Sequence, residues 1–356
     1  MLSEVRAPAL RIGAELSVEL HRDPPGEMPG AVPLHRESIQ ADLSDLVEET
    51  FVRGVLAERL PAWFETDPCS IVVEPHWHAR SSNDGAVESI GVRVEIGARS
   101  FELAFRSGRW MRRCQASAVR LQREGALGEG RAAYVRIVAQ RAGDGRASLP
   151  YLPPLQAPEI ADASLAELGI RAFEPGDLDP ERPVLVNARM VAEILQLTEQ
   201  AGANETGGAT LGRIVRLAEP LPGTSTRVVT LLTASFTDSR RNIGLPGKFT
   251  FDPQALVDTV ALAEQRELGE SVLTCFHSHG WGSGCNRCNQ NAACVLPEID
   301  VSHEDYALLA HLFPGKATLL PIAGRRLGAA GERPVLEIHA WRGGRMGPIA
   351  WRAYQD

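Results

Sequence analysis

The stretch Cys275-Phe-His277-Ser-His279-Gly280, with Ser302-His-Glu-Asp305 after it, decides the fold of the second half of the chain. Because side chains alternate between the two faces of a strand, His277 and His279 share a face and reach one metal ion together. The apolar run Val272-Leu-Thr-Cys-Phe that leads into them is typical of a buried strand. A His-x-His pair is a short motif, so its meaning depends on the residues downstream of it.

Ser302 marks the expected start of a helix, because a serine there precedes an apolar run and caps the first turn. Asp305 then falls at the third helical position, where its carboxylate faces back over that turn. Two histidines and one carboxylate leave the fourth position of a tetrahedral zinc ion open. An open position is the mark of a catalytic rather than a structural zinc site.

A second pair of this kind, His76-Trp-His78, has no S-x-x-D sequence after it. We expect this pair to bind no metal, because most short motifs of this type are coincidental.

The loop Glu205-Thr-Gly-Gly-Ala-Thr-Leu-Gly212 completes a pattern that resembles the JAB/MPN (JAMM) metalloproteases. Their motif is a distant glutamate, then H-[ST]-H, then S-x-x-D. The resemblance covers roughly residues 183–345. It implies that His277, His279 and Asp305 bind a catalytic zinc, that Glu205 is the general acid and base, and that Ser302 supports the oxyanion.

Two features depart from the family pattern. Gly280 stands where the family usually has proline, and the spacer before Ser302 is longer than usual and contains three of the six cysteines. Cys285, Cys288 and Cys294 offer three ligands for a possible second, structural zinc. The fourth ligand would be His303, Asp300 or Cys275, and the alternative is a polar loop whose thiols are incidental.

The fold expected is of the α+β/α-β-α class: a JAB/MPN-like (cytidine-deaminase-like) sheet flanked by helices, preceded by a separate α+β domain. Residues 1–150 form the N-terminal domain, 151–182 a proline-rich linker, and 183–356 the metalloprotease-like domain. Apolar spacing predicts helices over residues 38–64, 110–123, 188–201 and 253–266, with another after Ser302. Strands are predicted over residues 9–20, 70–74, 90–96, 101–105, 132–139, 184–186, 211–217, 228–235, 317–322 and 335–341. We expect the C-terminal sheet to be mostly antiparallel.

Composition excludes some classes of protein. A net charge of −8 argues against nucleic-acid binding, which usually requires a basic surface. No apolar run approaches the ~20 residues that span a bilayer, and the first residues contain no apolar signal core. We therefore expect a cytoplasmic protein with reduced thiols.

The resemblance implies a deubiquitinase-like zinc isopeptidase that cleaves after the C-terminal tail of a ubiquitin-like protein. In a bacterial conjugation system, E1-like and E2-like proteins would be its partners, and the N-terminal domain would dock the substrate or a partner. Two alternatives remain. One is a catalytically silent MPN scaffold, and the other is a peptidase that acts on sulfur-carrier proteins or peptides.

Overall fold

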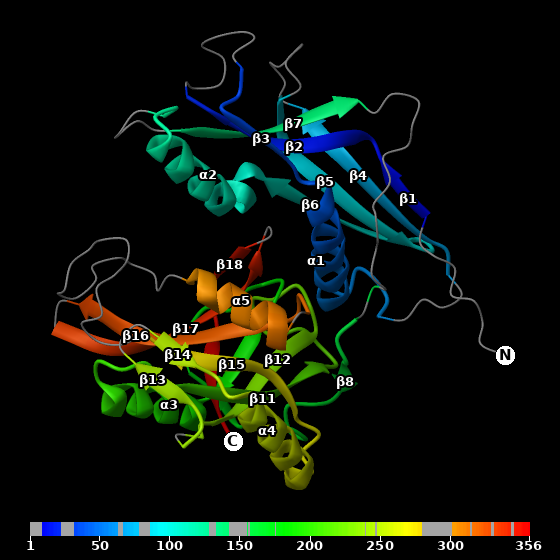
Figure 1. Cartoon of the computed structure of the whole chain (residues 1–356). Helices are drawn as coiled ribbons and strands as arrows, with labels where there is room; N and C mark the ends of the chain where they lie inside the picture. The colour runs from blue at the N-terminus through cyan, green and yellow to red at the C-terminus, as the bar shows by residue number, and fades with distance from the viewer. Residues whose placement is uncertain are drawn as a thin grey trace. The chain divides into compact units, whose positions relative to one another are not determined.

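The structure, a computed structural model, describes residues 9–22, 32–62, 67–77, 86–127, 133–141, 155, 157–174, 176–238, 240–245, 248–279, 301–313, 315–328, 331–342 and 345–356. These residues form two compact units (Figure 1). Apart from two short segments, the first unit ends at Ala157 and the second begins at Pro158. Cys285, Cys288 and Cys294 lie outside the described residues. None of the described helices is long and apolar enough to cross a membrane.

The first unit contains a seven-stranded sheet, in the order β1-β4-β5-β7-β2-β3 with β6 paired to β5. Its strands are β1 (Ala9–Ile12), β2 (Ala14–His21), β3 (His35–Ser38), β4 (Cys69–Trp77), β5 (Ala86–Ile96), β6 (Arg99–Arg106) and β7 (Tyr134–Arg141). The single strand expected over residues 9–20 is divided at Gly13, whose N–H donates to the carbonyl of Val73 at 3.1 Å. The chain therefore changes neighbours there, from β4 to β7.

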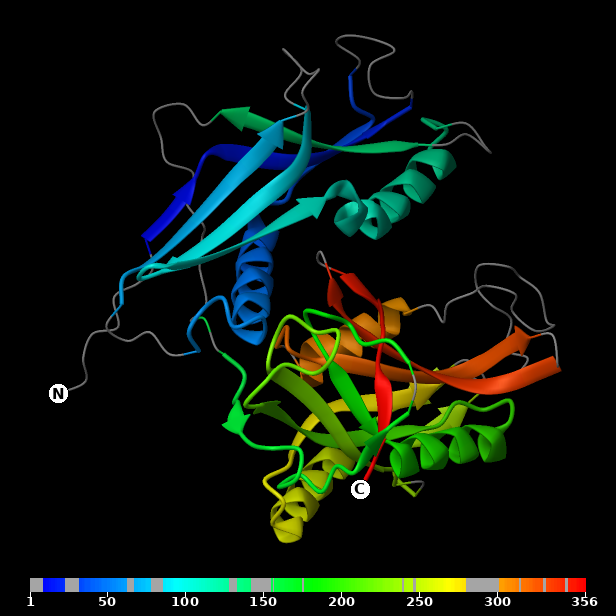
Figure 2. The same cartoon turned by 180° about the vertical axis from the view of Figure 1, so that it is seen from behind.

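Two α-helices, α1 (Leu43–Leu56) and α2 (Met111–Arg123), lie on the same side of this sheet in both views (Figure 2). The predicted helix over residues 38–64 is shorter than expected at both ends. A 3-10 turn (Gln40–Asp42) precedes it. After it, the N–H groups of Arg59 and Leu60 both donate to the carbonyl of Gly54, which closes the helix.

A buried carboxylate joins three strands of this sheet. Glu19 on β2 is opposite Arg36 of β3 and Arg136 of β7. Its carboxylate accepts hydrogen bonds from Nε of Arg36 at 2.7 Å and Nε of Arg136 at 2.9 Å, and it lies 2.8 Å from Nε2 of His21. Burial alone would raise the pKa of Glu19, but the hydrogen bonds from His21, Arg36 and Arg136 outweigh it and lower the pKa.

We expect Glu19→Gln to destabilise the first unit by about 3 kcal/mol, because it leaves two arginine charges without their carboxylate. The measurement is urea unfolding of the whole chain, followed by hydrogen exchange of peptides from β2 and β7. Since the folded-state pKa is lowered, the stabilisation is present above the ordinary carboxyl pKa and is lost as the pH falls through the folded-state value. The exposed Glu15 of the same strand provides the control, and equal exchange in Glu19→Gln and Glu15→Gln would contradict the prediction.

The second unit is built on a ten-stranded sheet, in the order β18-β17-β16-β15-β11-β12-β10-β19-β9 with β8 paired to β11. Its strands are β8 (Ala161–Asp162), β9 (Ala172–Phe173), β10 (Val184–Asn187), β11 (Gly207–Arg216), β12 (Val228–Phe236), β15 (Ser271–Ser278), β16 (Leu319–Gly328), β17 (Gly331–Arg342), β18 (Arg345–Ile349) and β19 (Arg352–Gln355). The longest pairings, β11–β12, β11–β15 and β16–β17, are antiparallel as expected. The sheet is nevertheless mixed, since the shorter pairings β15–β16, β10–β12, β10–β19 and β8–β11 are parallel. Apolar periodicity predicts a strand but not the direction of its neighbour.

Helices cover both faces of this sheet. The helix α3 (Ala188–Ala201) packs through Met190 and Ile194 on the face that carries Phe276. The other face carries Cys275 and packs against α5 (His303–Leu312) and, through Leu256, against α4 (Pro253–Arg266). This second face, between α4, α5 and the central strands, is the one that carries the predicted ligands.

Part of the predicted linker belongs to the second unit. Residues from Pro158 onward are grouped with it, and β8 and β9 pair with β11 and β19. Apolar packing attaches this segment to the second unit. Ile170 and Leu185 share a core cluster, against which Leu165, Leu168 and Phe173 pack. The proline content of the segment does not reveal these few apolar contacts.

Candidate metal centre

The two histidines lie at the end of a central strand, β15, which pairs with β11 on one side and β16 on the other. His277 is opposite Gly207 of β11 and Ile322 of β16. Past the strand end, the N–H of His279 donates to the carbonyl of Ala323 at 2.9 Å. Backbone hydrogen bonds therefore fix the chain direction through both histidines.

Asp305 reaches the same place from the first turn of α5. The N–H of Ser302 donates to Oδ2 of Asp305 at 2.6 Å, and the N–H of Asp305 donates to Oγ of Ser302 at 3.1 Å. This is a capping box, as the sequence predicts. It leaves Oδ1 of Asp305 to face β15.

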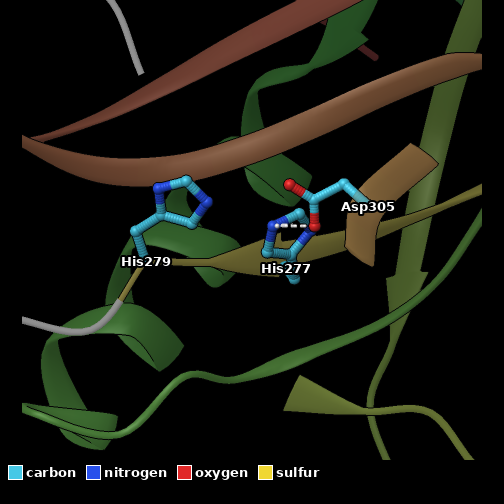
Figure 3. A group of neighbouring side chains, drawn as sticks. All are labelled: His277, His279 and Asp305. Carbon is cyan, nitrogen blue, oxygen red and sulfur yellow. Dashed lines mark ion pairs between the residues drawn. The ribbon is translucent and has the colours of Figure 1, made fainter. Parts of the chain in front are cut away.

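The side chains of His277, His279 and Asp305 converge (Figure 3). One ligand atom from each lies within 4.8 Å of the other two, the imidazole ring centroids are 5.2 Å apart, and Nε2 of His277 is 3.0 Å from Oδ1 of Asp305. His277 is 3% exposed; its Nε2 is paired with Asp305, and its Nδ1 has no hydrogen-bond partner among the described residues. Two imidazoles that converge on a buried carboxylate fit a bound cation, and this donor set suits zinc.

The charges at the site favour ligation. Burial lowers the pKa of His279 to about 4, so its ring is neutral near pH 7. Burial also acts to lower the pKa of His277, but Asp305 and then Glu205 outweigh it and raise the pKa. For Asp305, burial is outweighed by His277 and by the hydrogen bonds of Ser302, which lower its pKa. Asp305 is therefore ionised, and a cation between it and His277 would take the place of a proton.

Glu205 lies in the loop between α3 and β11, two residues before Gly207. It is half-buried and close enough to His277 to raise the pKa of that imidazole, but it is not in the ligand group. Its N–H donates to the carbonyl of Leu245 at 3.1 Å. Leu245 belongs to a hairpin, β13 (Ile243–Leu245) and β14 (Lys248–Thr250), that we did not predict. The dipeptide Pro246-Gly247, a turn signal, marks this hairpin in the sequence.

Gly244 of the hairpin lies so close to Glu205 that a Cβ there would overlap its carbonyl oxygen. In the zinc peptidase that the resemblance implies, we expect Gly244→Ala to displace the Glu205 loop and to reduce kcat by roughly 10²-fold, as an error of about 1 Å in a catalytic group does. Zinc content should not change. Peptidase kinetics and metal analysis on the same sample measure both quantities. Gly223→Ala, at a position where a Cβ meets nothing, controls for glycine loss, although its φ of 85° adds local strain.

Other residues singled out in the sequence have other places. Cys275 is buried in the core beside Leu320, and burial raises its pKa to about 12. His76 in the first unit lies 3.1 Å from Oγ of Ser89 and 3.4 Å from a carboxylate oxygen of Glu102. His78, Asp300 and the cysteines of the possible second zinc site lie outside the described residues, as does the side chain of His303.

Two buried ionisable residues were missed. Glu337 and His339 on β17 lie on the same face of the sheet as the histidines, because Glu337 is opposite Ile322, which is in turn opposite His277. In the sequence they stand in an ordinary alternating strand, and only the pairing of β15, β16 and β17 brings them to the site.

A comparison with known proteins identifies a family for part of the second unit. Residues 187–283 match the family Prok-JAB, described as prokaryotic homologs of the JAB domain. The matched segment contains Glu205, His277 and His279 and ends before Ser302. No curated protein matches the chain. A similar solved structure is that of protein DSY2949 from Desulfitobacterium hafniense, with 17% identity over 49% of this chain and 94% of that one. Its TM-score of 0.30 is too low to support an argument about the fold.

Proposed function

We propose that this chain, which carries a prokaryotic JAB-type domain at residues 187–283, is a zinc-dependent peptidase. The observation that carries the proposal is the convergence of His277, His279 and Asp305, whose ligand atoms lie within 4.8 Å of one another. Glu205 stands beside this group without belonging to it. Three protein ligands and a separate carboxylate are the equipment of a hydrolytic zinc site.

Each residue has a distinct part in the proposed reaction. A zinc ion held there would polarise the scissile carbonyl and lower the pKa of a water to about 7. Glu205 would take a proton from the attacking water and deliver it to the leaving amine. Ser302 uses a lone pair of Oγ to accept the N–H of Asp305, so its own O–H remains available to donate to the oxyanion.

For the substrate we propose the C-terminal tail of a ubiquitin-like protein, joined to a lysine amine or to further residues. The support is the family resemblance, together with a ligand set that is complete in this chain. E1-like and E2-like proteins would be its partners, and the first unit would dock the substrate or one of them. A silent scaffold is disfavoured because such domains have lost ligands. A peptidase acting on sulfur-carrier proteins or peptides would use the same residues.

The test is cleavage of a folded ubiquitin-like protein that carries a C-terminal extension, with mass spectrometry of the products. We expect a single cut after the tail when the chain is loaded with zinc, and none after chelation. A matched unstructured peptide with the same tail separates the substrates, because a peptide-trimming enzyme would cut both equally. A zinc-loaded chain that cleaves neither would contradict the peptidase proposal and favour the scaffold.

A further inference from the structure

Ser278 stands between the two histidines of the candidate metal centre, but its side chain has a different partner. Side chains alternate along β15, so Ser278 shares a face with Phe276 and not with His277. Ser278 is fully buried, at 0% exposure. A buried hydroxyl is expected to take part in a hydrogen bond, and that of Ser278 bonds to the loop that carries Glu205.

Two hydrogen bonds join Ser278 to this loop. The N–H of Thr206 donates to Oγ of Ser278 at 2.9 Å, and the N–H of Ser278 donates to the carbonyl of Thr206 at 2.7 Å. The second bond joins two backbone groups, so it does not depend on the side chain at position 278. The first bond requires an acceptor on that side chain, which serine supplies.

The peptide groups on both sides of Glu205 are held in this way. The N–H of Glu205 donates to the carbonyl of Leu245 in the hairpin at 3.1 Å, and the next N–H along the chain is the one that donates to Ser278. Both freely rotating backbone bonds of Glu205 lie between these two peptide planes. The hairpin and Ser278 together therefore set the direction in which the Glu205 side chain leaves the backbone.

The histidines do not depend on this hydroxyl. His277 is in register with strands on both sides, β11 and β16, and the N–H of His279 donates to the carbonyl of Ala323 at 2.9 Å. Removal of Oγ from Ser278 would release one side of the Glu205 loop and leave the backbone of the two candidate ligands in place.

We propose that Ser278 is a positioning residue for Glu205. Its hydroxyl accepts the N–H of Thr206 and thereby holds the Glu205 carboxylate in place beside the metal centre. A general base must lie within hydrogen-bond reach of the proton that it takes. The inference rests on the proposed function, because it takes Glu205 to be the general acid and base.

The first test is turnover of a ubiquitin-like fusion by the full-length, zinc-loaded chain. Ser278→Ala should lower kcat by roughly 10²-fold, the effect of an error of about 1 Å in a catalytic group, with KM and the Kd for zinc unchanged. Ser278→Thr keeps the hydroxyl and should restore kcat. Thr274→Val is the matched control, because it removes a buried hydroxyl from the same strand that bonds to the carbonyl of Leu319. It should not alter kcat. Wild-type kcat in Ser278→Ala would overturn the inference.

A double-mutant cycle separates a positioning role from a general effect on the fold. If Ser278 acts through Glu205, Ser278→Ala should cause no further fall in kcat in a chain that already carries Glu205→Gln. Independent, multiplying losses in the double variant would show that Ser278 acts by another route, and the proposed role would be wrong.

Hydrogen exchange of the Thr206 amide tests the contact without metal or turnover. This N–H should exchange slowly in the wild-type chain and faster in Ser278→Ala. Rapid exchange in the wild-type chain would contradict the proposal even if no variant folded. The proposed function fails differently: wild-type turnover in Glu205→Gln would remove the general base, whereas loss of turnover there with full turnover in Ser278→Ala would remove only the role of Ser278.

Discussion

Glu205→Gln is expected to abolish cleavage while the chain stays folded and keeps its zinc. Glutamine matches the size of glutamate but cannot carry a proton between water and the leaving amine. General acid–base groups typically supply ~10²–10⁴ in rate, so kcat should fall by that factor. KM should change little, because Glu205 is expected to act on the transition state rather than to bind the tail. Turnover of a ubiquitin-like fusion, with zinc measured in the same sample, gives both values.

The control for this variant is Glu219→Gln, an exposed glutamate in the loop after β11. It removes the same charge from the same unit, away from His277, and should retain full activity. If Glu205→Gln turned over at the wild-type rate, Glu205 would be an ordinary loop residue, and the proton would have to be carried by another group.

The double variant His277→Ala/His279→Ala is expected to contain one zinc fewer per chain than the wild type. It removes two of the three ligand atoms that lie within 4.8 Å of one another, and Asp305 alone cannot hold the ion against water. Elemental analysis after dialysis against a weak chelator measures the difference. A zinc held by the cysteine-rich insert would remain in both proteins, so only the difference is informative.

His76→Ala is the control for the double variant. His76 belongs to the other His-x-His pair of the chain and is placed by Ser89 and Glu102 in the first unit. Its replacement should not alter the zinc content. Equal zinc in the double variant and the wild type would show that the three converging side chains do not hold the metal.

Local signals in the sequence were sufficient for much of the second unit. The helices α3 and α4 span the predicted residues 188–201 and 253–266. Each begins at a side-chain cap, since Asn187 accepts from the N–H of Arg189 and Asp252 from that of Gln254. Caps and apolar periodicity are properties of neighbouring residues, so they can be read without the fold.

Features that depend on distant pairing were not predicted. The strands β18 and β19 are short and lie at the C-terminal end, and their partners are set by the sheet as a whole. At the site, the strand pattern and the helix-cap pattern in the sequence were sufficient to predict the positions of His277, His279, Ser302 and Asp305. The hairpin beside Glu205 and the pair Glu337–His339 come from elements that are far away in the sequence, and no local pattern connects them to the histidines.

The carboxylate of Asp305 divides its two oxygens between two tasks. Oδ2 caps α5 through the N–H of Ser302, and Oδ1 faces His277. An asparagine at this position would keep an oxygen for the cap, but it would lose the carboxylate charge that faces His277 at 3.0 Å and that a metal would require. In the proposed zinc peptidase, a duplicated copy could therefore lose its metal through one exchange of an oxygen for an amide nitrogen and still keep the cap that begins α5.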